Sequence, residues 1–300
     1  SPRAASTIGS RMHIRAGEFY SLHDLLYVLL LRSGNDAAVA IAEHISGSVE
    51  QFATLMNTKA KAIGATNSHF MNPHGLTQPD HYTTAHDLAL IARYALLNET
   101  FADIVATREI PLTYEQLDKR VLLHNTNRLL HMLEGADGVK TGTTAAAGRC
   151  LVASATRDEQ KLVAVILHAG NRWSDSQRLL EWGFGQFRLT YMGQKGERVR
   201  LLPVKDGKQL AVPLVLTADM PVVLPRSQSG LPVEVQGPDS VWAPVRKGQR
   251  LGKVIVRRNG QIVAEAELVA AQSVGKASLF DHMYRGMQPL LQWVTRGRMF

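Results

Sequence analysis

Apolar residues at helical spacing dominate the first part of the chain. Ser21 and Asp24 form a capping-box-like pair ahead of an apolar run that continues through Leu31. A short polar interruption, residues 33–35, follows, and an Ala-rich helix resumes at Asp36. The pattern predicts two successive helices joined by a tight turn.

The same capping pattern predicts two further helices. Ser48 with Gln51 opens one, and Thr84 with Asp87 opens the other. The stretch between them, residues 72–82 with the sequence NPHGLTQPDHY, is rich in Pro, Gly and Asn, which indicates a loop.

Beyond residue 148 the hydrophobic period changes from that of a helix to that of a strand. Residues 149–156 and 161–168 alternate and are joined by the polar turn RDEQ, which predicts an antiparallel hairpin. Residues 174–187 return to helical spacing. The pattern over residues 1–190 therefore predicts a domain of helices and an antiparallel sheet, of the α/β (α+β) class.

From Tyr191 onward the chain consists of short alternating runs broken by Pro and Gly. In GKVIVRRNGQIVAEAELVA, the pair Asn259-Gly260 between two alternating runs favours a tight primed turn. Residues 191–275 therefore predict a small all-β domain.

The last stretch, residues 276–300, predicts an amphipathic tail. Its apolar residues, among them Leu279, Phe280 and Met283, fall near one helical face and are accompanied by arginines and a tryptophan. Pro289 should kink this helix. Because the segment ends the chain, is basic and carries a tryptophan, we expect it to lie in a membrane interface rather than in a core.

Charge separates the two parts of the chain. Residues 1–190 hold 18 Lys and Arg against 18 Asp and Glu, whereas residues 191–300 hold 16 against 8. A basic second part attracts polyanions such as nucleic acid, anionic lipid or an acidic cell wall, although a well-solvated surface explains the charge equally well. The single cysteine, Cys150, excludes an internal disulfide.

Nothing at the N-terminus resembles a signal peptide, and no apolar run reaches the roughly 18 residues of a spanning helix. Nucleic acid is not expected as a partner, because the basic part shows no aromatic stacking platform and no known binding motif. A metal is not expected either, because the spacings of the histidines at 69, 74, 81 and 86 fit no common ligand set.

Candidate chemistry lies in ADGVKTGTTAAAG, residues 136–148. Lys140 supplies a cation for a carboxylate, Thr141 supplies a hydroxyl donor, and Gly142 lets the backbone of a ligand approach. Taken alone, the tripeptide is also compatible with an ordinary solvated loop lysine.

A second motif, RSGND, lies on the predicted turn between two helices. Ser33 and Asn35 are spaced to point into one cleft, where a hydroxyl can relay protons and an amide can orient a peptide. Ser33 could instead cap the helix that begins at Asp36. The two motifs in this order resemble the S-x-N and K-T-G elements of penicillin-binding proteins and serine β-lactamases.

Five stretches together resemble one family: LLLRSGNDAAVAIAEHISGS, MNPHGL, YTTAHDLALIARYAL, GADGVKTGTTAAAGRCLVASA and RLLEWGF. They are similar to the low-molecular-mass penicillin-binding proteins, the serine D-alanyl-D-alanine carboxypeptidases of the peptidase S11 type. The resemblance covers nearly the whole chain. It implies a penicillin-recognising, β-lactamase-like transpeptidase domain, followed by a β-rich domain and a membrane-associating amphipathic helix.

The resemblance also implies a reaction and a place in the cell. Such an enzyme removes the terminal D-alanine from peptidoglycan pentapeptide stems through an acyl-serine intermediate, and penicillins acylate the same serine. It needs no cofactor and is exported to the outer face of the bacterial cytoplasmic membrane, where the tail would meet an anionic membrane surface.

By the same resemblance, Ser33 would take part in the proton relay and Asn35 would bind the peptide amide of the substrate. Lys140 and Thr141 would receive the terminal carboxylate, and Gly142 would keep the strand edge open. Two further residues belong to this implied site: Thr143, whose backbone N–H would serve the oxyanion hole, and Arg172, beside the carboxylate, which would otherwise be an exposed helix-start residue. His74 and Gly75 resemble a structural turn, and Asp87 a helix-capping acid.

The nucleophile motif of this family, S-x-x-K, does not precede Ser33. None of the serines before it is followed three positions later by a lysine, and the one match elsewhere, Ser273 to Lys276, lies where the family carries no chemistry. We therefore expect an N-terminally truncated chain that forms no acyl-enzyme and folds less stably than the full protein.

Two rivals stay open. One is a class A β-lactamase. Two features argue against it: Gly34 replaces the usual aspartate, and the chain has an additional β-rich domain. The other is a non-catalytic protein that binds peptidoglycan or membrane and keeps the carboxylate-binding strand without the serine. The codons upstream of Ser1 would discriminate, because an in-frame S-x-x-K there indicates an enzyme.

Overall fold

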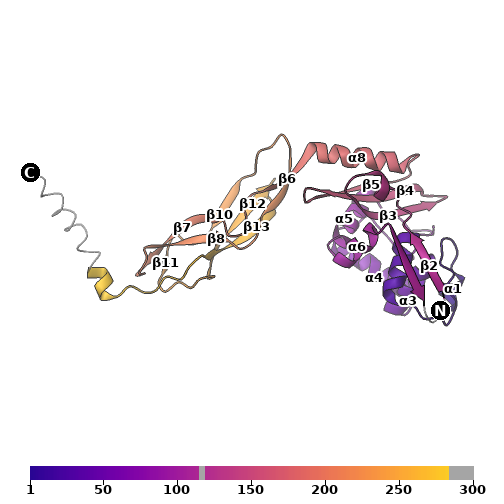
Figure 1. The fold of residues 1–300 in the computed structure, drawn as a ribbon, viewed down its shortest axis with the longest axis horizontal. Helices are drawn as coiled ribbons and strands as arrows, with labels where there is room; N and C mark the ends of the chain where they lie inside the picture. The colour runs from indigo at the N-terminus through magenta and orange to yellow at the C-terminus, as the bar shows by residue number, and fades with distance from the viewer. Residues whose placement is uncertain (115–118, 284–300) are drawn as a thin grey trace, which may run out of the picture. The chain divides into compact units, whose positions relative to one another are not determined.

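A computed structural model describes residues 1–114 and 119–283 of the chain (Figure 1). The chain divides into two compact units, Ser1–Gln186 and Phe187–Phe300. The first unit contains both of the motifs singled out above, and the second is the strand-rich part.

Helices build most of the first unit. They are α1 (Pro2–Ser6), α2 (Leu22–Arg32), α3 (Asn35–Ser46), α4 (Val49–Ala62), α5 (Ala85–Ala95), α6 (Glu99–Ala106), α7 (Leu129–Met132) and α8 (Arg172–Gln186).

The predicted capping pairs are confirmed. The side chains of Ser21, Ser48 and Thr84 each accept a hydrogen bond from the backbone N–H three residues later, at the start of α2, α4 and α5. These bonds satisfy backbone donors that the first turn of a helix leaves without a partner.

The described residues of the first unit form five strands in two sheets. A two-stranded hairpin joins β1 (Glu109–Tyr114) to β2 (Lys119–His124). A three-stranded antiparallel sheet has the order β3 (Ala136–Thr144), β4 (Gly148–Arg157) and β5 (Gln160–Ile166), so β3 lies at its edge. The β4–β5 hairpin confirms the alternation at residues 149–168.

The core beside this sheet explains the apolar pattern of α8. Leu151 and Ala153 of β4 pack with Leu180 and Phe184 of α8 and with Leu129 of α7. This packing fixes the helix against β4 and β5, and it holds Arg172, the first residue of α8, near the edge strand.

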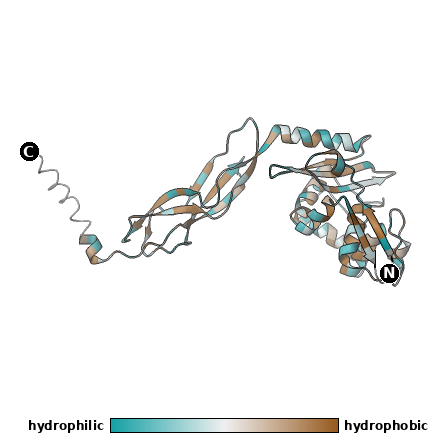
Figure 2. Cartoon of the chain, viewed as in Figure 1, coloured by the Kyte–Doolittle hydropathy of each residue, from teal (hydrophilic) through white to brown (hydrophobic). Residues whose placement is uncertain are grey.

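The second unit is built of strands, as the sequence predicts. Its strands are β6 (Phe187–Tyr191), β7 (Arg198–Lys205), β8 (Ala211–Leu216), β9 (Pro221–Pro225), β10 (Val233–Gln236), β11 (Val241–Trp242), β12 (Arg250–Arg258) and β13 (Gln261–Ala270). Six of them form one sheet in the order β10-β12-β13-β8-β7-β11, and β6 pairs with β9. Hydrophobic residues recur along these strands (Figure 2). Their buried side chains form a core of this unit.

The predicted primed turn connects β12 to β13. Asn259 and Gly260 both have positive φ, 50° and 82°, which is the backbone conformation that such a turn requires.

The predicted tail at 276–300 is only partly covered by the structure. Residues 279–283 are helical, and residues 284–300, with the rest of the predicted amphipathic helix, lie outside the described residues. Within the described part of the chain, no helix has both the length and the apolarity needed to cross a membrane.

Candidate active site

The K-T-G motif lies on the edge strand β3. Pairing with β4 sets Thr141 opposite Leu151 and Thr143 opposite Arg149. Because side chains alternate along a strand, Thr141 and Thr143 share one face of the sheet, and Lys140 faces the other side.

Lys140 is half-buried, and its ammonium Nζ donates a hydrogen bond to the backbone oxygen of Thr141 at 2.9 Å. Burial, together with the positive charge of Arg172, lowers the pKa of Lys140 to about 8. The interpretation of Lys140 as a solvated loop lysine is therefore wrong. A partly desolvated amine of this kind gains most when an anion approaches it.

The S-x-N motif occupies the junction of α2 and α3. Ser33 ends α2 in the left-handed conformation, with φ 59° and ψ 42°, and α3 begins at Asn35 with Gly34 as its N-cap and no capping side chain. The alternative that Ser33 caps α3 is therefore wrong. A Cβ at Gly34 would lie 2.5 Å from a methyl carbon of Val28, so this tight junction requires glycine.

Asn35 is buried and held by the segment that precedes α2. Its side-chain Nδ2 donates to the backbone oxygen of Ile8 at 2.7 Å, and its backbone N–H donates to the oxygen of Ser10, also at 2.7 Å. Gly9 lies so close that a Cβ there would approach Nδ2 to 2.6 Å. The orientation of the Asn35 amide is thus set by residues 8–10.

Thr126 connects the two motifs. Its hydroxyl donates to the backbone oxygen of Leu31 at 3.0 Å and shares a second hydrogen bond with the hydroxyl of Thr141 at 2.9 Å. Leu31 lies two residues before Ser33, and Thr141 directly follows Lys140. One side chain therefore ties the end of α2 to the K-T-G strand.

Sequence reasoning missed Thr126 and its neighbour Asn127. The Asn127 side chain is 1 % exposed and donates to the backbone oxygen of Gly138 at 2.9 Å. The Asn and Thr residues of this stretch, HNTNRLL, are a signal for a loop. No spacing in the sequence indicates which strand such a loop would contact.

Arg172 reaches the edge strand from the start of α8. Its Nη1 donates to the backbone oxygen of Gly142 and the hydroxyl of Thr143, each at 2.9 Å. Burial and the nearby charge of Arg149 lower the pKa of Arg172 below its usual value. The alternative that Arg172 is merely an exposed helix-start residue is wrong, because its guanidinium is half-buried at the end of β3.

In the S-x-x-K match of the second unit, the serine hydroxyl and the lysine ammonium contact different residues. The hydroxyl of Ser273 accepts a hydrogen bond from the backbone N–H of Lys247 at 2.9 Å, whereas the Nζ of Lys276 lies 3.6 Å from a carboxylate oxygen of Asp206. A lysine engaged with a carboxylate is not placed to take a proton from that serine.

The neighbouring His and Asp residues are structural. The side-chain oxygen of Asn72 accepts from the N–H groups of His74 and Gly75, which makes the predicted turn. Burial would raise the pKa of Asp87, but hydrogen bonds from the Ser68 hydroxyl and the Asn67 N–H lower it overall. Across residues 1–114 and 119–283, no three His, Cys, Asp or Glu side chains cluster as metal ligands.

Two family models match the chain. Residues 2–171 match the D-alanyl-D-alanine carboxypeptidase model, and residues 187–276 match the model of the C-terminal domain of penicillin-binding protein 5. The fold and the two motifs define the class of penicillin-binding serine hydrolases. The chain belongs to the D-alanyl-D-alanine carboxypeptidase family, peptidase S11, whose members act on peptidoglycan in the cell envelope.

Known relatives resemble the chain over most of its length. The D-alanyl-D-alanine carboxypeptidase DacF of Bacillus subtilis is 35 % identical over 292 residues, which cover 96 % of this chain and 75 % of that protein. DacC of Escherichia coli is 33 % identical over 285 residues, covering 92 % of this chain and 69 % of that protein. The crystal structure of penicillin binding protein 5 from Haemophilus influenzae is 32 % identical with a TM-score of 0.66, covering 89 % of this chain and 78 % of that one.

Proposed function

We propose that this protein trims peptidoglycan by removing the terminal D-alanine from pentapeptide stems through an acyl-serine intermediate, the species that penicillins also form. The observation that carries the proposal is the charge at the edge strand. Lys140 and Arg172 both lie at β3, and neither has a carboxylate partner in the part of the chain that the structure describes. A terminal carboxylate would supply the missing charge.

Each motif residue has a role in this proposal. The Lys140 ammonium and the Thr141 hydroxyl, which leave β3 on opposite sides, receive the terminal carboxylate at the open edge of this strand. Arg172 supplies a second cation beside it. Gly142 keeps the strand edge accessible: the nearest atom to a Cβ placed there is the Cβ of Cys150, at 3.9 Å. The backbone N–H of Thr143 then stabilises the oxyanion of the tetrahedral intermediate.

The S-x-N residues serve the other side of the scissile bond. Asn35, fixed by Ile8 and Ser10, donates to or accepts from the peptide amide of the substrate. Ser33 relays a proton between the nucleophile and the leaving amine, because its hydroxyl lies at the α2–α3 junction that Thr126 ties to β3. The nucleophile itself is a serine activated by a neighbouring base.

This 300-residue chain is expected not to be labelled covalently by a fluorescent penicillin. Its one S-x-x-K match, Ser273 to Lys276, has its lysine beside Asp206, and an unactivated serine is a poor nucleophile. Denaturing gel electrophoresis after incubation measures the labelling, with DacF of Bacillus subtilis as the control that should be labelled. A stable fluorescent band from this chain would contradict the expectation.

The proposal includes a domain organisation for the chain. Residues 1–190 form the carboxypeptidase domain, residues 191–275 a β-rich domain, and residues 276–300 a tail that associates with the anionic outer face of the cytoplasmic membrane. Three apolar side chains at the start of the tail support this: Leu279, Phe280 and Met283 are 83 %, 77 % and 62 % exposed. Exposed apolar residues next to basic ones favour an anionic lipid interface.

Exchange of Phe280 for glutamate is expected to weaken binding to anionic vesicles about tenfold or more, because it removes an apolar side chain and adds a negative charge. Cosedimentation with phosphatidylglycerol vesicles, compared with phosphatidylcholine vesicles, measures the change. Leu97→Glu is the matched control, since Leu97 is 78 % exposed in the first unit. Equal binding of wild type and Phe280→Glu would exclude a role for this residue.

A further inference from the structure

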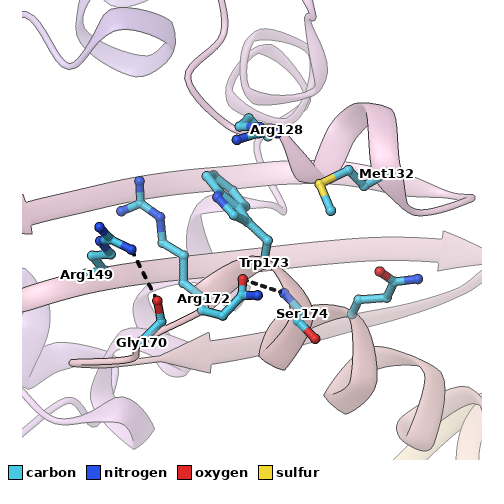
Figure 3. A pocket seen from close by; sticks show the side chains of 9 residues that line it. Arg128, Met132, Arg149, Gly170, Arg172, Trp173 and Ser174 are labelled. Atoms are coloured by element: carbon cyan, nitrogen blue, oxygen red, sulfur yellow. Dashed lines mark hydrogen bonds between the residues drawn. The ribbon is translucent and has the colours of Figure 1, made fainter.

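A pocket of about 640 Å³ lies in the first unit beside Arg172 (Figure 3). Its walls come from three elements: α7 with its N-cap, the start of β4, and the first two turns of α8 with the residues that precede them. Three guanidinium groups line it, those of Arg128, Arg149 and Arg172, together with the side chains of Trp173 and Gln177. No Asp or Glu is among its lining residues.

Within the described residues, the side-chain hydrogen bonds of Arg149 and Arg172 all go to neutral groups. Arg149 donates to the backbone oxygen of Gly170 at 3.2 Å, and Arg172 donates to two backbone oxygens and one hydroxyl. Among the described residues, none of the three arginines forms an ion pair with a carboxylate. Burial lowers the pKa of Arg172, and the positive charge of the nearby Arg149 lowers it further.

Arg172 belongs both to the pocket and to the proposed carboxylate site. Arg172 lines the pocket and also donates to the hydroxyl of Thr143. Arg149 lies directly opposite Thr143 in the β3–β4 pair, so their side chains emerge next to each other on the same face of the sheet. A group that extends past Thr143 from a bound terminal residue would therefore meet Arg149, and Arg128 lines the same pocket.

We propose that this arginine pocket is a second anion-binding subsite, which takes a side-chain carboxylate carried by the C-terminal residue of the substrate. The inference rests on the proposed function, because it requires the terminal carboxylate to bind at Lys140. Arginine suits such a subsite, since its planar fork can hold a carboxylate through two parallel hydrogen bonds. The protein would then favour stems that end in an acidic D-residue over stems of equal size that end in a neutral one.

Isothermal titration of the chain with three acetylated tripeptides tests the subsite. The peptides end in D-Ala-D-Ala, D-Ala-D-Glu and D-Ala-D-Gln, so the last two match in size and differ in charge. In low-salt buffer we expect the D-Glu peptide to bind about tenfold more tightly than the D-Gln peptide, and the difference should shrink as salt is added.

Variants separate the pocket from general electrostatic attraction. Arg128→Gln and Arg149→Gln should each reduce the preference for D-Glu to less than about threefold and leave affinity for the D-Ala-D-Ala peptide within twofold. Arg178→Gln, an exposed arginine of α8 outside the pocket, should leave the preference intact. Thermal unfolding of each variant checks that its fold is unchanged.

The outcomes distinguish the two levels of the proposal. Equal affinity for the D-Glu and D-Gln peptides, or a preference that survives both pocket variants, overturns the subsite and leaves the carboxylate site at Lys140 standing. Failure of all three peptides to bind overturns the carboxylate site and the subsite together.

Discussion

Replacing Lys140 by methionine should weaken binding of a peptide ending in D-Ala-D-Ala by about 100-fold at pH 7. Lys140 is half-buried, and its ammonium is hydrogen-bonded to the strand that would hold the terminal carboxylate. Removal of one partner from a desolvated charge pair costs about 3 kcal/mol, which corresponds to roughly this factor. Methionine retains the apolar stem of the side chain, so that the loss reports the charge rather than the packing.

The pH dependence of binding provides the internal control. Burial, with a contribution from Arg172, lowers the pKa of Lys140 to about 8, so the ammonium is charged below pH 8 and becomes neutral above it. Wild-type affinity for the carboxylate should therefore be full at pH 7 and fall as the pH rises through 8 and beyond, although a bound carboxylate raises the pKa and shifts the fall to higher pH. The methionine variant should show no such fall.

The charge of Lys140 favours binding of the carboxylate but lowers the stability of the folded protein. The folded state disfavours the charged form of Lys140, because its pKa lies below the unfolded value of 10.5. The free energy of unfolding of the wild type should accordingly rise between pH 8 and 10.5, and at pH 7 Lys140→Met should be more stable than wild type by up to about 3 kcal/mol. Lys61→Met, on the exposed surface of α4, is the matched control for both measurements.

A methionine variant that keeps wild-type affinity, with an unchanged pH profile, would remove Lys140 from the carboxylate site. A loss of binding with a loss of stability would indicate that Lys140 acts through the fold. Only weaker binding in a fold at least as stable as wild type fits a ligand-binding cation.

The sequence predicted the helix starts and the tight turn of this fold, because the hydrogen bonds and backbone preferences that form them involve residues close together in the chain. The side chains of Ser21, Ser48 and Thr84 cap helices through hydrogen bonds to residues three positions later. Asn259-Gly260 forms a two-residue turn. Each of these contacts is decided within a few residues, so the sequence pattern is sufficient to find it.

The parts that sequence reasoning missed depend on contacts between distant residues. Thr126 joins Leu31 to Thr141, and the first of these contacts spans 95 positions. The capping alternative for Ser33 failed for a related reason: the close approach of Val28 to Gly34 fixes the junction, and Ser33 adopts a left-handed conformation that serine rarely takes. Such arrangements follow from tertiary packing, for which a single sequence offers no local signal.

Replacing Asp36 by alanine should destabilise the first unit by about 3 to 5 kcal/mol. Asp36 is fully buried, and its carboxylate accepts hydrogen bonds from the backbone N–H groups of Met12, Ile14 and Ala37 at 2.9 to 3.2 Å. Alanine would leave these donors without an acceptor, and each buried donor left in this state costs about 1 to 3 kcal/mol. Urea unfolding followed by circular dichroism measures the change.

Replacing Asp36 should also disturb the S-x-N motif, because Asp36 holds the segment before α2 that contacts Asn35. The same stretch of chain supplies the backbone oxygens of Ile8 and Ser10 that orient Asn35, so its release from α3 would free the Asn35 amide. Asp36→Asn, which keeps one acceptor oxygen, should lose less stability than Asp36→Ala, and Asp103→Ala, on the exposed side of α6, should lose less than about 0.5 kcal/mol. If Asp36→Ala unfolds at the same urea concentration as Asp103→Ala, the segment is held by its apolar contacts instead, and Asn35 owes its orientation to packing rather than to this carboxylate.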